Sequence, residues 1–488
     1  MNVLDQIHAA PRDTTIVVQS HADLAHALRD RGFHVLLVGG TSDRVQCVAN
    51  ARELEDQWSR LSCRNPSAIA IASPEVCETV ERATNRAAIN NNTSVFRARG
   101  WVEHFVRNLP TLTNPCGIAL EGLRGVPAFV VGAGACLDRN HHLLEEASRK
   151  GIVIAVNAAA RLQAVDVALT VESNDLRHKL GPLTHVGLRA FGVTAPPAVM
   201  AHGEGVLAPI FAGELGGLVE RITGVPKLAC SAHGGTAAFS LAERWGCDPI
   251  VLVGMDFALA DGGRIYPECL GIGDSRAKIV DGAWAFDWDP TLKAQPRANP
   301  LHDHDAAVEV ASIDGGKVWS TGAFSGTRAW FESAAVGMRG HHRLISAAEW
   351  GAAVAGFEAK TLRAVLDELP DREFSAQNGG SVPEERLKDW IGAHMRGLYG
   401  VWEAAAMADV DAATAAMLIA LRAAPLLEPW CHAHVAAVMA ERRSAAPRRN
   451  ARAEWAIAGH HARRVIGILA DEAHSLAAEL EVARDAVG

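Results

Sequence analysis

The stretch Pro127 to Asn140, PAFVVGAGACLDRN, contains residue types that could bind a phosphate. A short apolar run, Ala128 to Val131, is followed by Gly132-Ala133-Gly134-Ala135-Cys136 and then by a helical pattern that continues to Lys150. A turn of this kind leaves backbone N–H groups unpaired at a helix N-terminus, where an anion is favoured. Glycine also allows φ > 0 and lets a ligand approach the backbone closely. Tight strand-to-helix turns use glycine for steric reasons as well, so the GxG alone leaves both interpretations open.

A second turn, Cys230 to Thr236 (CSAHGGT), begins another helical pattern, which leads into an apolar run ending near Asp256. Its hydroxyls and N–H groups would again lie at a helix N-terminus. Two such turns in one domain favour a nucleotide ligand, with one turn for the phosphate and the other for the ribose or base. The absence of GxGxxG with a suitably spaced acidic residue argues against a dinucleotide, and the first turn is not a GxxxxGK(S/T) loop.

Three further groups could carry chemistry, and each has a simpler interpretation. Cys136 at a helix N-terminus could be a nucleophile, but no partner base is evident and a small residue in an anion-binding turn explains it better. Asp287-Trp288-Asp289 could hold a divalent metal, although two carboxylates in an acidic loop are commonly solvated. His302-Asp303-His304-Asp305 alternates along a strand and offers no third metal ligand. We therefore assign no metal site, and a general base is the better chemical role for one of these histidines.

The elements that must position these residues form an α/β pattern. Candidate strands are 128–131, 152–156, 167–171, 188–192, 206–211 and 250–253, with helical patterns at 139–150, 176–183, 214–222 and 234–245. This alternation predicts a doubly wound, mainly parallel, Rossmann-like sheet with its ligands at the carboxyl ends of the strands. The candidate ligand-binding segments at these strand ends are Gly132–Cys136, Asn157, Glu172-Ser173-Asn174-Asp175 and Gly254-Met255-Asp256.

The flanking regions predict two further domains. Strands at 15–19, 33–38 and 67–72 around a helix at 23–31 suggest a small α/β unit, and the Ala-rich region from Pro383 suggests a bundle of three or four helices. Residues 257–305 are expected to be an irregular functional loop or lid, followed by a hairpin (307–313 with 317–320), a helix at 325–336 and a strand at 343–346. We expect an N-terminal α/β domain (1–110), a central domain (111–360) and a C-terminal helical domain (361–488).

The composition excludes several classes of protein. The chain has 488 residues and a net charge of −9, which argues against a nucleic-acid-binding surface. No apolar run is long enough for a membrane span, and the N-terminus lacks the features of a signal peptide. The nine cysteines are scattered without a CxxC pair, which fits a reducing cytoplasm.

The segment PAFVVGAGACLDRNHHLL resembles PAxxVGAGPSLDKNxxLL, a signature of the motility accessory factor family of proposed flagellin glycosyltransferases. The resemblance continues, in matching order, through IAVNAAARLQAVDVALTVESND, CSAHGGTAAFSLAERWGCDPIVLVGMDFALADGG, DGGKVWSTGAFSGTRAWFES and SAAEWGAAVAGFE. Together these segments span about residues 95 to 360. The resemblance implies a central sialyltransferase-like domain between a smaller α/β domain and a helical domain. Bacterial sialyltransferases with a GNGPSL loop show a similar series of strand ends.

The resemblance also implies a reaction and a set of site residues. The donor would be a CMP-activated nonulosonic acid, of the pseudaminic or legionaminic type, and the acceptor a Ser or Thr hydroxyl of flagellin, with no obligatory cofactor because a monophosphate leaving group carries less charge than a diphosphate. Carried over, the donor-binding residues would be Gly132, Ala133, Gly134, Ala135 and Cys136 (phosphate and ribose), Asn157, Glu172, Ser173 and Asn174 (nucleotide and sugar), and Ser231, Gly234, Gly235 and Thr236 (cytidine). Tyr266 would stabilise the leaving phosphate. Candidate general bases are Asp256, Glu349 and His302 or His304.

The chain departs from the family pattern in two places. The Pro-Ser of the loop is Ala135-Cys136 here, and the Tyr expected soon after Asp256 is Ala258. Two alternatives therefore stay open. One is an ATP-dependent transferase similar to archaeal 6-hydroxymethylpterin diphosphokinase, which shares the GAGPSLD-type core and uses magnesium. The other is a non-catalytic accessory protein that binds or exports flagellin.

Overall fold

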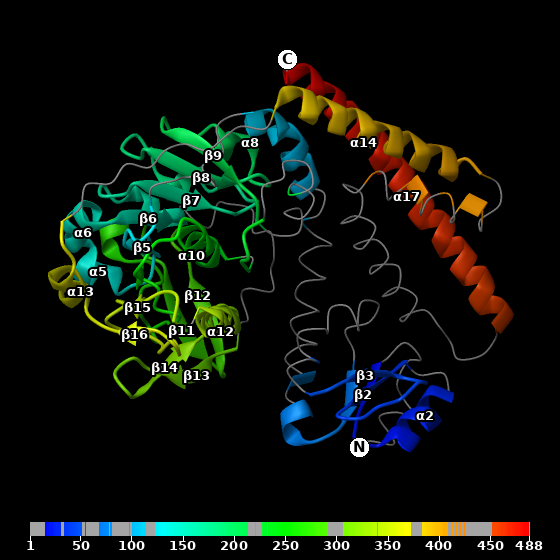
Figure 1. Cartoon of the computed structure of the whole chain (residues 1–488), viewed down its shortest axis with the longest axis horizontal. Coiled ribbons are helices and arrows are strands. Elements are labelled where there is room, and N and C mark those ends of the chain that lie inside the picture. The colour runs from blue at the N-terminus through cyan, green and yellow to red at the C-terminus, as the bar shows by residue number, and fades with distance from the viewer. Residues whose placement is uncertain are drawn as a thin grey trace. The chain divides into compact units, whose positions relative to one another are not determined.

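The computed structural model divides the chain into two compact units (Figure 1). One comprises Met1–Arg99 and Gly397–His474, and the other comprises Gly100–Arg396 and Ser475–Gly488. The residues that the structure describes are 15–30, 34–50, 54, 68–77, 79–80, 97, 100–113, 123–212, 220, 227–231, 233–290, 306–338, 340–371, 383–407, 412–413, 416, 419–420, 424 and 451–487, without the side chains of 34, 451–466 and 472.

The first unit contains a four-stranded parallel sheet. Its elements are β1 (Thr15–Gln19), α2 (Ala22–Asp30), β2 (His34–Val38), β3 (Gln46–Val48) and β4 (Ala68–Ile71), and the strand order is β3-β2-β1-β4. Ile16 and Val18 pack on the side of Leu28 in α2, whereas Val17 packs on the other side with Leu54. Because both faces of the sheet are covered, the interiors of β1 and β2 are apolar, and three of the four strands were predictable from sequence.

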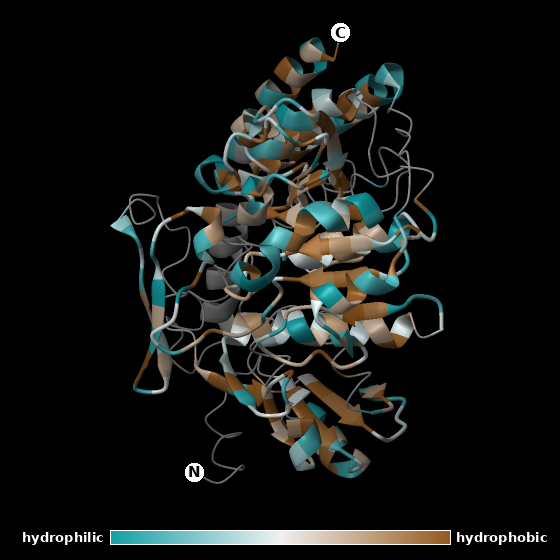
Figure 2. Cartoon of the chain, turned by 90° about the vertical axis from the view of Figure 1, so that its left-hand side faces the viewer, coloured by the Kyte–Doolittle hydropathy of each residue, from teal (hydrophilic) through white to brown (hydrophobic). Residues whose placement is uncertain are grey.

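The second unit is built on an eight-stranded sheet in which all neighbouring strands are parallel. The strands are β5 (Ala128–Val131), β6 (Ile152–Val156), β7 (Val167–Thr170), β8 (Leu188–Gly192), β9 (Val206–Ile210), β10 (Ile250–Val253), β15 (Leu344–Ser346) and β16 (Glu358–Ala359). Their order is β16-β15-β10-β5-β6-β7-β8-β9. The strands of this sheet are strongly hydrophobic (Figure 2). The predicted class, an α/β fold with a central parallel sheet, is confirmed.

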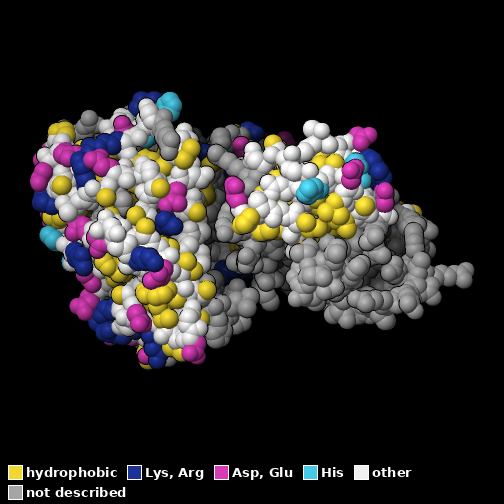
Figure 3. Space-filling model, turned by 90° about the horizontal axis from the view of Figure 1, so that it is seen from below, with side chains coloured by type: hydrophobic (Ala, Val, Ile, Leu, Met, Phe, Trp, Pro, Cys, Tyr) yellow, Lys and Arg dark blue, Asp and Glu magenta, His cyan; other side chains and the backbone are white. Residues whose placement is uncertain are grey.

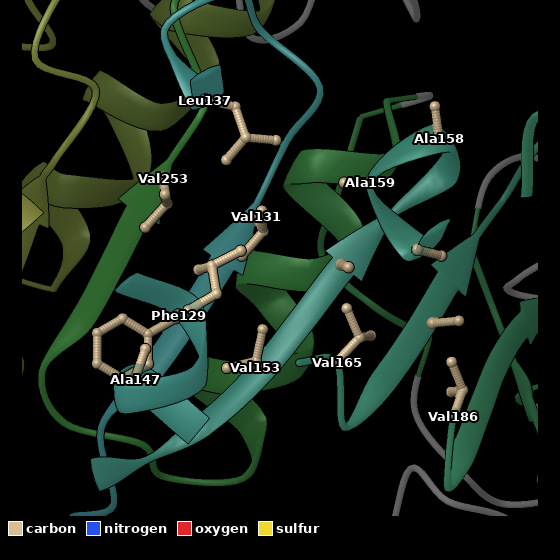
Figure 4. Close-up of a cluster of buried hydrophobic side chains, with 14 of the residues drawn as sticks. Phe129, Val131, Leu137, Ala147, Val153, Ala158, Ala159, Val165, Val186 and Val253 are labelled. Atoms are coloured by element: carbon tan, nitrogen blue, oxygen red, sulfur yellow. The ribbon is translucent and has the colours of Figure 1, made fainter. Parts of the chain in front are cut away.

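Helices cover this sheet. They include α5 (Leu137–Asn140), the 3-10 turn η3 (His141–Leu143), α6 (Leu144–Lys150), η4 (Asn157–Arg161), α7 (Arg177–Leu180), α8 (Pro197–Met200), α10 (Gly234–Arg244), α12 (Gly322–Gly337) and α13 (Leu362–Glu368). Phe129 of β5 and Val153 of β6 share one buried cluster with Ala147 of α6 (Figure 4). Phe239 of α10 packs instead against Trp330 and Phe331 of α12, with ring centroids 6.0 and 5.3 Å away.

The strand order reverses between β5 and β10. From β5 the chain adds β6 to β9 in sequence on one side, and it then returns to place β10 on the other side of β5. Ligands of open α/β sheets bind at such a switch point, outside the carboxyl ends of the strands. The two loops that leave β5 and β10 are hydrogen-bonded together, with Gly132 N–H donating to Val253 O (2.8 Å) and Gly134 N–H donating to Gly254 O (2.9 Å).

Within the predicted loop 257–305, the described part, residues 257–290, is more regular than the sequence predicted. Strands β11 (Arg276–Val280) and β12 (Ala283–Asp287) form an antiparallel hairpin, and η5 (Glu268–Leu270) precedes it. The hairpin turn is Asp281-Gly282, with φ of 50° and 78°, and Asp-Gly is the sequence that favours a two-residue turn with two positive φ values. The expectation of an irregular segment was therefore wrong for this part. The hairpin predicted at 307–313 and 317–320 is confirmed as β13 (Val308–Ala311) with β14 (Lys317–Ser320).

Two long helices are described in the C-terminal region, α14 (Glu384–Ala405) and α17 (Ala451–Ala486). The remaining helices of the predicted bundle fall outside the described residues. Leu469, Leu476 and Leu480 of α17 are buried, as their spacing predicts. No helix among the described residues is long and apolar enough to cross a membrane. On the face shown in Figure 3, basic and acidic side chains are interspersed over the described surface.

Candidate active site

A cavity of about 450 Å³ lies at the switch point of the central sheet. Its floor comes from the loops after β5, β6, β7 and β10, and its walls from residues 257–266, the end of β12, the start of α12 and Trp350. Volumes of this order are typical of pockets for small ligands. The described residues from sequence analysis that line it are Gly132, Ala133, Gly134, Ala135, Asn157, Glu172, Asn174, Asp256 and Tyr266. Those that are not among its lining residues are Cys136, Ser173, Ser231, Gly234, Gly235, Thr236 and Glu349. His302 and His304 lie outside the described residues.

The loop Gly132–Cys136, called the glycine loop below, is hydrogen-bonded to Asp256. The Cys136 N–H donates to Asp256 Oδ2 (2.9 Å) and the Cys136 thiol donates to Asp256 Oδ1 (2.6 Å). A Cβ on residue 134 would lie 2.5 Å from Asp256 Cγ, so only glycine allows this approach. Burial raises the pKa of Asp256 to about 6, although the bonds from Cys136 oppose the shift. The carboxylate therefore occupies N–H groups that a turn of this type would otherwise offer to a phosphate.

Cys136 acts as a hydrogen-bond donor in this arrangement. Burial, and next the Asp256 charge, raise the pKa of its thiol far above the ordinary value, so the thiol keeps its proton. A nucleophilic role, which needs the thiolate, has no support from this geometry. A serine hydroxyl at the same position would make the same bond to the carboxylate, which is consistent with the interpretation of Cys136 as a replacement for serine.

Tyr266 enters the cavity beside a cation that the sequence analysis did not identify. Lys179 Nζ donates to Tyr266 Oη (2.9 Å) and lies 5.2 Å from the centre of the ring. Because the ammonium supplies the proton of this bond, the hydroxyl proton of Tyr266 is free to point into the cavity. Arg264 also lines the cavity and is paired with Glu268 (3.0 Å) and Asp274 (3.4 Å). The lining thus includes the Tyr266 hydroxyl and two cations, Lys179 and Arg264.

Asn157 is a strained, polar residue at the end of β6. Its φ is 50°, and its side-chain Oδ1 is buried with no hydrogen-bond partner among the described residues. Left-handed backbone at a non-glycine residue is uncommon and concentrates at ligand sites, and a buried acceptor without a partner costs about 1–3 kcal/mol. Since Asn157 lines the cavity, its amide is suited to accept a hydrogen bond from a ligand.

The turn before α10 is held by its own side chains. Thr236 Oγ1 donates to His233 O (2.7 Å) and lies 3.0 Å from Ser231 Oγ, and Thr236 is fully buried. Gly234 packs against β6, because a Cβ there would lie 2.5 Å from Val156 Cγ1. The residue of this turn that lines the cavity is His233. Its neighbours Ser231, Gly234, Gly235 and Thr236, predicted from sequence as ligand contacts, do not line the cavity.

His233 is the N-cap of α10, and its Nδ1 accepts a hydrogen bond from Gly235 N–H (3.1 Å). Burial lowers its pKa to about 4, so the ring is neutral near pH 7. An accepting Nδ1 in a neutral imidazole places the proton on Nε2. His233 can therefore donate a hydrogen bond through Nε2, although the sequence-based site did not include it.

The Glu349 side chain does not line the cavity and is hydrogen-bonded elsewhere. Its Oε1 accepts a hydrogen bond from Leu362 N–H at the start of α13 (3.1 Å), and its backbone carries a φ of 61°. Of the described carboxylates, Asp256 and Glu172 line the cavity. Four aromatic residues also line the cavity: Phe286, Trp288, Phe324 and Trp350. The ring centroids of Phe286 and Trp288 lie 5.5 Å apart. Trp288 is the residue between the two acidic residues singled out as a possible metal motif.

No protein-family model and no curated protein matches the sequence. Among solved structures, the chain is similar to the MAf glycosyltransferase from Magnetospirillum magneticum AMB-1. The similarity has a TM-score of 0.56 at 13% sequence identity, and it covers 98% of this chain and 83% of that one. At this identity the likeness concerns the fold. The chain thus shares, over nearly its whole length, the fold of a MAf glycosyltransferase.

Proposed function

We propose that the chain is a sialyltransferase-like glycosyltransferase that moves a nonulosonic acid from a CMP-activated donor to Ser or Thr hydroxyls of flagellin. One observation carries the proposal: a cavity of ligand size lies at the switch point of a chain that shares the fold of a MAf glycosyltransferase. The finer assignment of donor and acceptor comes from the motifs between residues 95 and 360 that resemble the motility accessory factor family.

The polar groups of the cavity suit the departure of a phosphate. As the bond from the anomeric carbon to the phosphate oxygen breaks, negative charge develops on CMP. The Tyr266 hydroxyl, supported by Lys179, and the Arg264 guanidinium would stabilise this charge. Asn157 and Asn174 would hold polar groups of the nucleotide and the sugar, and the aromatic lining residues would pack on a base or on the apolar side of a sugar ring.

The acceptor hydroxyl needs a base, and Glu172 is the best placed among the described carboxylates. Asp256 has both oxygens engaged by Cys136, and Glu349 caps α13. Glu172 follows β7 and lines the cavity. It would take the proton of the Ser or Thr hydroxyl while the oxygen attacks the anomeric carbon and CMP leaves. Asp256 would then be a positioning residue for the glycine loop.

The test is intact-mass spectrometry of flagellin co-expressed with the chain in a host that makes the CMP-activated sugar. The expected result is a mass increase equal to one or more nonulosonic acid residues. The sequence has two tyrosines, which provide a matched pair of variants. Tyr266→Phe should abolish most of the increase, whereas Tyr399→Phe, on the exposed surface of α14, should not.

Calorimetric titration separates the alternatives. CMP should bind and ATP with magnesium should not, and the reverse would favour a diphosphokinase-like transferase. If CMP binds but neither flagellin modification nor donor hydrolysis occurs, the chain is a non-catalytic accessory protein that has kept the nucleotide cavity.

A further inference from the structure

Asp138, His141 and Cys269 form a cluster outside the residues that line the cavity. One possible ligand atom from each lies within 4.8 Å of the other two. Asp138 is exposed, and His141 and Cys269 are half-buried, so an ion in solution can reach the cluster. None of the three has a part in the transfer reaction proposed above.

Two segments distant in the sequence bring these residues together. Asp138 lies on α5 and His141 at the start of η3, three residues later, which places both on the same side of the chain. Cys269 lies on η5. The Asp138 carboxylate accepts hydrogen bonds from the backbone N–H groups of Glu268 and Cys269, both at 2.9 Å. The backbone on both sides of the cluster is therefore already held in place before any ion binds.

We propose that this cluster binds Zn²⁺. Thiolate, imidazole and carboxylate are all zinc ligands, and a site with three protein ligands leaves the fourth tetrahedral position to water. Zinc–ligand bonds of about 2.0–2.3 Å imply ligand atoms roughly 3.5 Å apart in a tetrahedral site. From separations of at most 4.8 Å, the ligand atoms would have to come together by up to about 1 Å.

The surrounding bonds suit zinc ligation. His141 Nδ1 lies 3.3 Å from the backbone carbonyl of Leu137, and a hydrogen bond from Nδ1–H to a carbonyl orients metal-bound histidines and leaves the lone pair on Nε2. The sulfur of the Cys269 thiol (S–H) lies within 4.8 Å of an Asp138 carboxylate oxygen. Zinc would take the place of this thiol proton, so each ion bound releases one proton to solvent and joins sulfur to carboxylate through the metal. The two N–H bonds to Asp138 can persist.

The experiment uses the full-length chain after metal removal. Zn²⁺ is titrated against a chromophoric chelator, and Co²⁺ is titrated with absorption spectroscopy. We expect one Zn²⁺ per chain, one proton released per ion, and a thiolate-to-cobalt charge-transfer band. Cys269→Ser should abolish that band and weaken Zn²⁺ binding by at least about tenfold, since even loss of an outer-shell partner costs 10–100-fold.

His142→Ala is the matched control. Its ring neighbours that of His141, with centroids 6.0 Å apart, yet it is not one of the three clustered residues. Binding should be unchanged in this variant. As a measurement that needs no variant, Zn²⁺ should protect Cys269 from alkylation in the wild-type chain, as peptide mass spectrometry would show.

Three results would overturn the proposal: no stoichiometric Zn²⁺ binding, an equal loss of affinity in His142→Ala and Cys269→Ser, or alkylation of Cys269 at the same rate with and without Zn²⁺. Circular dichroism of each variant distinguishes loss of a ligand from loss of the fold. If Cys269→Ser does not fold, the alkylation and cobalt results on the wild-type chain decide the question alone.

Discussion

The carboxyl group of Asp256 should make the stability of the chain depend on pH. It lies 3% exposed beneath the glycine loop, and burial raises its pKa from 3.8 to about 6. The folded chain therefore binds this proton more tightly than the unfolded chain. Its contribution to stability is fully present below pH 3.8 and is lost as the pH rises through about 6. Over the whole window the change in unfolding free energy is about 3 kcal/mol, at 1.36 kcal/mol for each tenfold change in proton affinity.

The substitution Asp256→Asn tests this reasoning, because asparagine keeps the shape of the side chain and cannot titrate. An amide nitrogen facing the donors of Cys136 should destabilise the variant by about 1–3 kcal/mol at every pH. In addition to that constant difference, the unfolding free energy of the wild type relative to the variant should fall by about 1 kcal/mol between about pH 5 and about pH 7.5, since the buried carboxyl group of the wild type loses its proton in this interval.

The assay is urea denaturation of both proteins at both pH values, followed by tryptophan fluorescence. Groups that titrate in both proteins cancel in the difference. Asp175→Asn is a matched control. The hydrogen bond from Arg177 lowers the pKa of Asp175, so the contribution of Asp175 to stability is lost only in more acidic solution. The difference in unfolding free energy between this variant and the wild type should therefore stay constant between the two pH values. A wild-type advantage over Asp256→Asn that stays constant, or grows with pH, would refute the buried carboxyl as the source.

Three further outcomes are expected. Gly134→Ala should destabilise the chain by about 1–3 kcal/mol, because the added methyl group would overlap the Asp256 carboxyl group. In Gly326→Ala on α12 the methyl group meets nothing within 4 Å, so this variant should be more stable by about 0.5–1 kcal/mol. Thermal denaturation measures both changes. Tyr266→Phe should lower the rate of donor turnover by about 10²–10³-fold with a smaller change in KM, as steady-state kinetics would show. Asn157→Gly allows the positive φ but removes the side-chain amide. The affinity for CMP, measured by calorimetry, should fall by about tenfold while thermal stability is unchanged. An unchanged affinity would contradict a ligand-binding role for Asn157.

The central sheet could be predicted from sequence because its strands are buried on both faces. Runs such as Ile152–Val156 and Ile250–Val253 are apolar without interruption, so their bounds matched the observed strands. The hairpin β11–β12 was missed for a different reason. Its residues alternate only partly between buried and exposed, and the deciding signal was the turn Asp281-Gly282, which the Gly- and Asp-rich composition of the segment obscured.

The floor of the cavity was also predictable, because parallel strands bring their carboxyl ends to one edge. Sequence could not show how the loops meet there. Cys136 and Asp256 are 120 positions apart, and the bond between them depends on which strands are neighbours at the switch point. For the same reason Lys179 was missed: α7 carries no motif, and its ammonium matters only because the 257–266 segment places Tyr266 beside it.

Each compact unit combines two separated stretches of the chain, and this has a consequence for biosynthesis. The central unit takes its last part from Ser475–Gly488, where Glu479 pairs with Arg107 through two bonds (2.7 and 3.1 Å). The first unit likewise needs Gly397–His474. Neither unit can be completed on the ribosome until nearly the whole polypeptide has emerged, whereas domains contiguous in sequence fold one after another during synthesis. A premature stop codon between residues 397 and 474 would therefore leave both units incomplete.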